Sequence, residues 1–156
     1  MARKKQVELE PWTFNGKPFT QEMVGKLEGF VYLITDRVNG KMYIGKKFFG
    51  GMRKAKGAKR RSKIVSDWEK YFGSNDEIKQ LVKEEGPQRF KREILSLHQL
   101  KRDVNFCEIR EQWKRDVLEA VDENGERLYY NENINGKHFP YLVIGWQDRS
   151  QIASSA

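Results

Sequence analysis

Two runs of β-branched and aromatic residues predict a pair of neighbouring strands, over residues 29–36 and 41–47. Asn39-Gly40 lies between them, and this dipeptide strongly favours a tight hairpin. Side chains alternate between the two faces of a strand, so an even-numbered loop puts Tyr32, Tyr43 and Lys47 on one face. Two phenols beside an amine are unusual in a purely structural hydrophobic core. They therefore indicate a candidate functional site.

The remaining pattern predicts helices, one further strand and an extended return. They are a short helix over 66–72, a helix over 76–85, a strand over 90–97, a long helix over 103–120 and an extended segment over 128–134. This order favours an α/β fold, in which a small, mainly antiparallel three-stranded sheet (β-β-α-β-α order) is flanked by helices.

The chain of 156 residues is long enough for one compact domain with its own core. We predict an N-terminal arm over residues 1–27, held to the domain by its scattered aromatic side chains. The domain itself is expected over residues 28–140. Residues 141–156 form a C-terminal extension that ends in small polar residues and is expected to fray.

Positive charge is concentrated in one stretch, residues 46–63, which exceeds the formal net charge of +8 on its own. It contains no acidic residue, and its basic residues are Lys46, Lys47, Arg53, Lys54, Lys56, Lys59, Arg60, Arg61 and Lys63. Its three glycines predict a mobile loop. A positive loop directly after the tyrosine hairpin indicates nucleic-acid binding; the alternative is a solvated loop.

Several classes of function find no support in the sequence. Cys107 is the one cysteine, so a disulfide framework or a cysteine-based zinc cluster within the chain is excluded. No glycine-rich phosphate loop opens a helix, which argues against a nucleotide cofactor. We expect a soluble, cytoplasmic protein, because no signal peptide or membrane span is recognisable. His98 and His138 have no metal-ligand spacing around them, and the oligomeric state stays open.

The long helix carries acidic side chains whose placement follows from its periodicity. An apolar stripe is predicted to face the core, and it consists of Phe106, Ile109, Trp113 and Val117. Glu108 then falls on the opposite, solvated face with Gln112, Arg115 and Glu119. Glu111 lies on the flank between the two faces, where a partly desolvated carboxylate suits a metal ligand. The structural alternative is a boundary glutamate tied to Lys114.

The hairpin resembles the two halves of the GIY-YIG nuclease signature. Residues 43–45 read Tyr-Ile-Gly, and residues 30–32 read Phe-Val-Tyr where the family has Gly-Ile-Tyr. The predicted order of elements agrees with the fold of that family. The chain is also similar to small phage-encoded GIY-YIG endonucleases of the homing type, although no separate DNA-binding domain is evident.

The resemblance implies one glutamate as the protein ligand of a divalent cation, Mg²⁺ or Mn²⁺, and Glu111 fits that position. Glu108 is the alternative. Magnesium often uses one or two carboxylates and keeps its waters, so a single glutamate is sufficient. The family also has an arginine about ten positions after the second tyrosine, which here is Arg53. Arg60 or Arg61 could replace Arg53 if the loop contains an insertion.

The resemblance also implies roles for the tyrosines and for an asparagine. Many members carry a histidine near the arginine, which this loop lacks, so we predict Tyr32 as the group that takes the proton of the attacking water. Lys47, Arg53 and the cation would lower the pKa of Tyr32, and Tyr43 would orient water or phosphate. Asn131, in the Tyr-Asn pair after the long helix, would tie the last segment to the hairpin; Asn133 is the alternative.

The resulting hypothesis is a metal-dependent DNA endonuclease of the phage or mobile-element homing type. The residues expected to bind DNA are Lys46, Lys54, Lys56, Lys59, Arg60, Arg61 and Lys63. Two alternatives remain, a branched-DNA or repair nuclease of the same fold and a noncatalytic nucleic-acid-binding module. A dependence on divalent ions would separate a nuclease from a binder.

Overall fold

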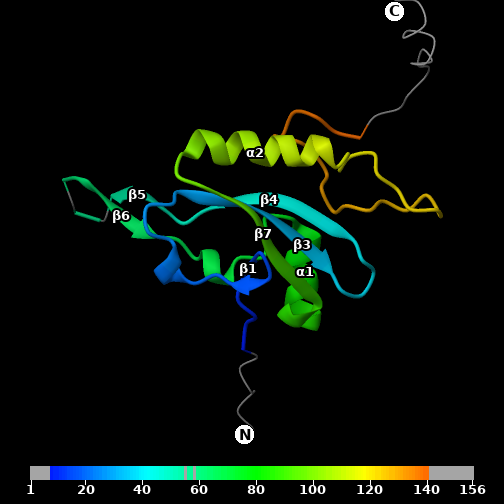
Figure 1. Cartoon of the computed structure of the whole chain (residues 1–156), viewed down its shortest axis with the longest axis horizontal. Coiled ribbons are helices and arrows are strands. Elements are labelled where there is room, and N and C mark those ends of the chain that lie inside the picture. Colours follow the sequence, from blue (N-terminus) through cyan, green and yellow to red (C-terminus); the bar gives the residue numbers. More distant parts are fainter. Residues whose placement is uncertain (1–7, 55, 58, 141–156) are drawn as a thin grey trace, which may run out of the picture.

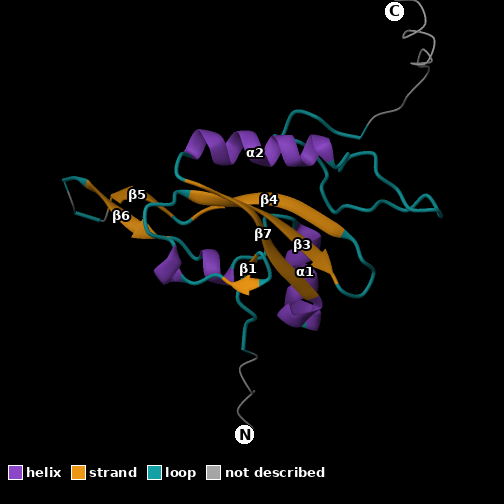
Figure 2. Ribbon diagram, in the orientation of Figure 1, coloured by secondary structure: helices purple, strands orange, loops and turns teal. Residues whose placement is uncertain are grey.

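A computed structural model of the chain describes residues 8–54, 56–57 and 59–140. For residues 52–54 and 61–63 only the backbone is described. A central sheet lies between α2 on one face and α1 on the other, and a separate two-stranded ribbon projects from one end (Figure 1). Figure 2 shows the same layers by type of element.

The central sheet has five strands in the order β2-β1-β7-β3-β4. Their bounds are β1 Thr13–Phe14, β2 Lys17–Pro18, β3 Gly29–Asp36, β4 Met42–Phe48 and β7 Phe90–His98. Neighbouring strands are antiparallel except β1 and β7, which are parallel. The α/β class is therefore confirmed, but the sheet is five-stranded and mixed rather than three-stranded.

The two extra strands come from the segment predicted as an N-terminal arm. β1 adds to the outer edge of β7 through Thr13 and Phe14, and β2 folds back on β1. Their two-residue length gives no alternating pattern that a sequence could reveal. Trp12 and Phe19, on either side of them, are buried in the core, and the Trp12 indole donates a hydrogen bond to the Trp68 carbonyl at 2.8 Å.

Each face of the sheet covers its own hydrophobic core, because side chains alternate along β3. Phe30, Tyr32 and Ile34 face a core shared with Ile78 of α1, an α-helix over Asp76–Glu85. Val31 faces the second core. That core also contains Ile44, Cys107, Val117, Leu118, Tyr129 and Ile134.

α2 spans Lys101–Lys114, and its orientation differs from the one predicted: of the apolar stripe, only Ile109 and Val117, which follows the helix, pack with the second core. Phe106 and Trp113 are exposed, whereas Cys107 and Gln112 are buried. The helix also ends six residues early, because Asp116 adopts a left-handed conformation (φ 51°) and the following chain returns to the core. The short helices are 3₁₀ turns over Gln21–Met23, Trp68–Lys70 and Pro87–Arg89.

The basic segment is an antiparallel β-ribbon rather than a mobile loop. β5 (Gly50–Lys54) pairs with β6 (Arg61–Val65) in continuous register, from the Gly50–Val65 pair to the Lys54–Arg61 pair. The ribbon has no partner strand in the central sheet. It follows β4 after Phe49, whose amide donates to the Glu28 carbonyl at 2.9 Å, so its base is fixed to the domain.

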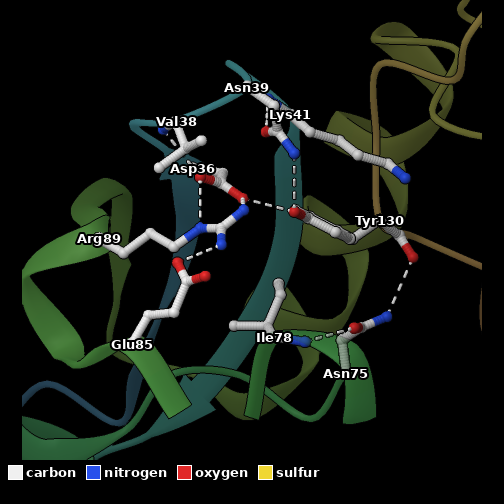
Figure 3. Close-up of polar contacts among 9 residues, drawn as sticks. All are labelled: Asp36, Val38, Asn39, Lys41, Asn75, Ile78, Glu85, Arg89 and Tyr130. Carbon is white, nitrogen blue, oxygen red and sulfur yellow. Dashed lines mark hydrogen bonds and ion pairs between the residues drawn. The ribbon is translucent and has the colours of Figure 1, made fainter. Parts of the chain in front are cut away.

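A polar network fixes the far end of the β3–β4 hairpin (Figure 3). The carboxylate of Asp36, which is fully buried, accepts hydrogen bonds from Arg89 at 2.8 and 2.9 Å and from the Tyr130 hydroxyl. The Tyr130 carbonyl in turn accepts from Asn75, whose side chain caps the start of α1 through Ile78. One tyrosine therefore connects the hairpin, α1 and the segment after α2.

Within the residues that the structure describes, no helix combines the length and the apolar character needed to cross a bilayer.

Candidate active site

The tyrosine hairpin has the geometry expected from its sequence. Tyr32 lies opposite Gly45, and Tyr43 lies opposite Ile34, so the two phenols share a face of the sheet. Lys47, opposite Phe30, is on that face as well. The ring centroids of Tyr32 and Tyr43 are 6.2 Å apart. The common face of these three residues is confirmed.

Asn131 occupies the open edge of β4, the last strand of the sheet. Its side-chain oxygen accepts from the Ile44 amide at 3.0 Å, and its nitrogen donates to the Ile44 carbonyl at 2.8 Å. The amide thus pairs with the strand as another strand would, and Asn131 is buried. The structure confirms the contact between the last segment and the hairpin that the sequence predicted.

A pocket of about 260 Å³ lies along this edge of β4. Its walls come from β4, the start of α1, α2 and the segment after Tyr130. The lining residues are Tyr43, Lys46, Ser74, Asn75, Asp76, Glu108, Gln112, Asn131, Glu132, Asn133 and Asn135. The pocket is therefore open to both faces of the sheet. The Tyr43 phenol lies on one side, and the Glu108 carboxylate and the Lys46 amine lie on the other.

Glu108, rather than Glu111, faces this pocket. The carboxylate of Glu108 is 14% exposed and lies 3.4 Å from the ammonium of Lys46. Burial raises the pKa of Glu108, and Lys46 partly offsets that rise. Glu111 is equally buried, at 15% exposed, but lies against Arg115 at 3.3 Å and Arg110 at 3.8 Å. Both glutamates are therefore partly buried, and their neighbours rather than their burial distinguish them.

Gln112 is a pocket residue that sequence analysis placed on the solvated face. It is 5% exposed, and its amide nitrogen donates to the Ile44 carbonyl at 3.1 Å. Its side-chain oxygen is buried without a hydrogen-bond partner among the described residues. A buried amide oxygen is costly to leave unpaired, so a donor or a cation in the pocket would satisfy it. Helical periodicity alone gave no signal for this position.

The surroundings of the two phenols raise their pKa values, contrary to our expectation for Tyr32. Tyr32 is 1% exposed, and burial, followed by the neighbouring Tyr43 and Tyr71, raises its pKa well above 10. Burial also raises the pKa of Tyr43. Lys47 is not among the groups that shift the pKa of Tyr32, and its ammonium pairs with Asp67 at 2.8 Å. Tyr43 lines the pocket and hydrogen-bonds Ser74 at 3.0 Å, whereas Tyr32 lies behind it.

The expected phosphate-binding residues lie on the β5–β6 ribbon and at its base. Lys46 lines the pocket, and the tip of the ribbon exposes Lys56, Lys59 and Arg60. Arg53 lies in β5, where its backbone pairs with Ser62. The side chains of Arg53, Lys54, Arg61 and Lys63 lie outside the described part of the structure.

A protein-family model matches the chain over residues 12–134. The matching family is described as "Putative endonuclease segE, GIY-YIG domain". The chain belongs to the GIY-YIG nuclease family. The match includes the hairpin, the ribbon, both helices and Asn131, and so covers every wall of the pocket except Asn135. No significant match was found among curated proteins or among solved structures.

The donor set of the pocket fits a hard divalent cation held by few protein ligands. Among the described residues, no group of three or more histidine, cysteine, aspartate or glutamate side chains could hold a metal ion. Glu108 and Gln112 nevertheless line one pocket, and the side-chain oxygen of Gln112 is buried without a partner among the described residues. Oxygen donors of this kind suit Mg²⁺, which keeps most of its waters when bound through one or two side chains.

Proposed function

We propose that this GIY-YIG domain is a divalent-cation-dependent endonuclease that hydrolyses phosphodiester bonds in DNA. The observation that carries the proposal is the pocket at the edge of β4, where Tyr43 and Lys46 of the signature hairpin and Glu108 of α2 line one space. A carboxylate for a cation, an amine for a phosphate and a phenol for a water are the groups that phosphodiester hydrolysis requires.

Glu108 is our candidate for the protein ligand of the cation, with Gln112 beside it. Glu111 becomes the alternative, because two arginines already surround its carboxylate. A divalent cation held there, Mg²⁺ or Mn²⁺, would supply positive charge against the phosphate and the leaving oxygen. Asn131 keeps the edge of β4 in place, and so fixes the carbonyl and amide of Ile44 beside the pocket.

Tyr43 is our candidate for the phenol that orients the attacking water or the phosphate, because it lines the pocket. Tyr32 remains a proposed proton acceptor that acts from behind Tyr43. Its raised pKa makes the phenolate scarce at neutral pH, which predicts a rate that increases with pH. Lys47 contributes charge near the phenols from its position 4.1 Å from the Tyr71 ring centroid.

Arg53 and the ribbon are proposed to hold DNA. Arg53 would stabilise negative charge on the scissile phosphate, with Arg60 or Arg61 as the alternatives. The other ribbon residues would neutralise flanking phosphates, and they are Lys54, Lys56, Lys59 and Lys63. The homing type of function, in a phage or another mobile element, is a further inference from resemblance alone.

Cleavage of supercoiled plasmid DNA by the purified chain, with Mg²⁺ or with EDTA, tests this proposal. Glu108→Gln and Glu111→Gln form a matched pair, because both remove one charge from a similarly buried carboxylate of α2. We expect Glu108→Gln to lower the cleavage rate about a thousandfold or more, since several kcal/mol of charge stabilisation would be lost. Glu111→Gln should retain most activity, and both variants should still bind DNA.

The same assay separates the alternatives. If Glu111→Gln is the inactive variant, the ligand role returns to Glu111. Preferential cleavage of a four-way junction over the plasmid would favour a branched-DNA nuclease. DNA binding that persists in EDTA, with no cleavage of either substrate in Mg²⁺ or Mn²⁺, would favour the noncatalytic module and contradict the nuclease proposal.

A further inference from the structure

A second depression, which we call the ribbon groove, lies at the base of the β5–β6 ribbon. Its volume is about 420 Å³, and its walls include Lys46, Lys47, Phe48, Gly51, Ile64 and Tyr71. Lys46 lines both the ribbon groove and the active-site pocket, so the two spaces are neighbours. In Figure 1 the ribbon projects away from the end of the central sheet. Lining residues of the groove come from β4, from the two strands of the ribbon and from Tyr71.

Gly51 has no structural reason to be a glycine. It lies inside β5, its backbone is not in the left-handed region, and a β-carbon there would meet none of the described atoms within 4 Å. Glycine weakens a strand interior, and it often marks a place where a ligand approaches the backbone closely. The missing side chain therefore leaves room on the face that Gly51 shares with its cross-strand partner Ile64.

The walls of the ribbon groove combine an apolar surface with positive charge. Ile64 is 40% exposed although it is a large aliphatic side chain, and it lies across from the open space at Gly51. Phe48 and Tyr71 add aromatic rings. Lys46, which also lines the active-site pocket, and Lys47, which pairs with Asp67, add positive charge. A ligand that matches such walls has a flat, weakly polar part and an adjoining anionic part.

We propose that the ribbon groove binds one unstacked nucleobase of the strand whose phosphate lies in the active-site pocket. This inference rests on the proposed nucleic-acid substrate. The base would lie over Gly51 and against Ile64 and Phe48, while its phosphate faces Lys46. Bases stack on apolar and aromatic side chains with little sequence preference, and each stacked base adds appreciably to affinity. The groove would thereby position the strand relative to Glu108 and Tyr43.

The test compares binding of two probes in EDTA, where cleavage is prevented. One is a short fluorescein-labelled thymidine oligonucleotide, and the other is an abasic oligonucleotide of the same length and charge. We expect the wild-type chain to bind the thymidine probe about five- to a hundredfold more tightly, the range for one stacked base. Gly51→Val, which fills the groove, should reduce this preference to about twofold or less, on the same scale.

Two further variants control for folding of the ribbon. Ile64→Ser and Val65→Ser remove similar β-branched side chains from adjacent positions, and both side chains are already partly exposed. They lie on opposite faces of β6, and only Ile64 lines the groove. We expect Ile64→Ser to lose the thymidine preference and Val65→Ser to keep it.

Equal binding of the two probes by the wild-type chain would overturn the base site and leave the nuclease proposal intact. The same conclusion would follow if Gly51→Val and Ile64→Ser both kept the thymidine preference. Failure to bind either probe would overturn the base site and would also count against DNA as a partner. Plasmid cleavage, which is measured separately, decides the nuclease proposal on its own.

Discussion

Gly45 lies directly opposite Tyr32 in the β3–β4 pair, and a β-carbon on Gly45 would lie 2.3 Å from the Tyr32 hydroxyl oxygen. The glycine of the Tyr-Ile-Gly string therefore makes space for the first tyrosine of the hairpin. Its backbone is not left-handed, so the requirement is for room rather than for conformational freedom. The two halves of the family signature thus fit together where Tyr32 of β3 pairs with Gly45 of β4.

Gly45→Ala should consequently destabilise the hairpin. An added methyl group that meets a fully buried ring forces a shift of the ring or the strand, and such overpacking costs about 1–3 kcal/mol. Urea denaturation would measure the loss in the free energy of unfolding. Gly51→Ala is the control, because its β-carbon would contact none of the described atoms within 4 Å. Equal stability of the two variants would contradict the role of Gly45.

The two phenols can be separated by single-atom deletions. Tyr43→Phe should lower the cleavage rate by about a hundredfold or more, the range for a positioned hydrogen-bonding or acid–base group. Tyr32→Phe should have a smaller effect at neutral pH, because its raised pKa leaves little phenolate there. Single-turnover cleavage under saturating DNA would give both rates. If Tyr32→Phe lowers the cleavage rate more than Tyr43→Phe does, Tyr32 rather than Tyr43 is the phenol that contacts the attacking water.

The pH profile of the same reaction tests the role of Tyr32 directly. A phenol that accepts a proton must first be ionised, and below its pKa the ionised fraction grows about tenfold per pH unit. Because the pKa of Tyr32 is raised, the wild-type rate should keep rising with pH through the alkaline range. Tyr32→Phe should lose this slope. A slope that survives in Tyr32→Phe would assign the proton transfer to another group.

The parts of the fold that follow local rules could be predicted from the sequence. The β3 strand, the bounds of α1 and the shared face of Tyr32 and Tyr43 all depend on periodicity and turn residues close in the chain. The added strands β1 and β2 depend on a long-range pairing with β7, and two residues per strand show no period. The sequence predicts a mobile loop in place of the β5–β6 ribbon, because basic residues and glycines obscure its weak strand pattern.

The site was predicted less completely, and α2 explains why. Periodicity shows which residues share a face of a helix but does not show which face meets the sheet. The apolar stripe through Phe106 and Trp113 is exposed, and the polar face through Glu108 and Gln112 forms a wall of the pocket. Only the tertiary contact with β4 decides between them. A functional site is where local patterning and the final fold are expected to disagree.

The Asp36 network gives a prediction about stability and pH. Burial alone would raise the pKa of Asp36, but hydrogen bonds from Arg89 and Tyr130 outweigh it and lower the pKa. Asp36→Asn should cost about 1–3 kcal/mol in the free energy of unfolding, because Arg89 and Tyr130 lose a charged acceptor while Arg89 keeps its pair with Glu85. Glu10→Gln, which breaks an exposed pair with Arg37, is the control and should change stability little.

The pH dependence of that difference has a defined sign. A lowered folded-state pKa gives stability that is complete above the ordinary aspartate pKa of about 3.9 and is lost as the pH falls through the folded-state value. The difference in the free energy of unfolding between the wild-type chain and Asp36→Asn should therefore be constant near neutral pH. It should become smaller in acid. Urea denaturation at a series of pH values measures it. A difference that becomes larger in acid would contradict the assigned pKa direction.

Lys46 is expected to have opposite effects on cation binding and on DNA cleavage. Its ammonium lies 3.4 Å from the Glu108 carboxylate, in the place where a bound cation would be attracted. Removing one positive charge about 5 Å from a divalent ion favours that ion by roughly 1.7 kcal/mol in a water-like medium, or nearly twentyfold in affinity. Lys46→Met should therefore bind Mn²⁺ more tightly in calorimetric titrations.

Lys46→Met should cleave DNA more slowly, because a phosphate that enters the pocket no longer has the Lys46 ammonium to pair with. Lys47→Met is the matched control: it removes the same charge from the next position of β4, but that ammonium pairs with Asp67 on the other face of the sheet. Its Mn²⁺ affinity should change much less. A weaker or unchanged Mn²⁺ affinity in Lys46→Met would show that Lys46 does not compete with the cation. In that case Glu108 would lose its place as the preferred ligand, and Glu111 would be tested next by the same titration.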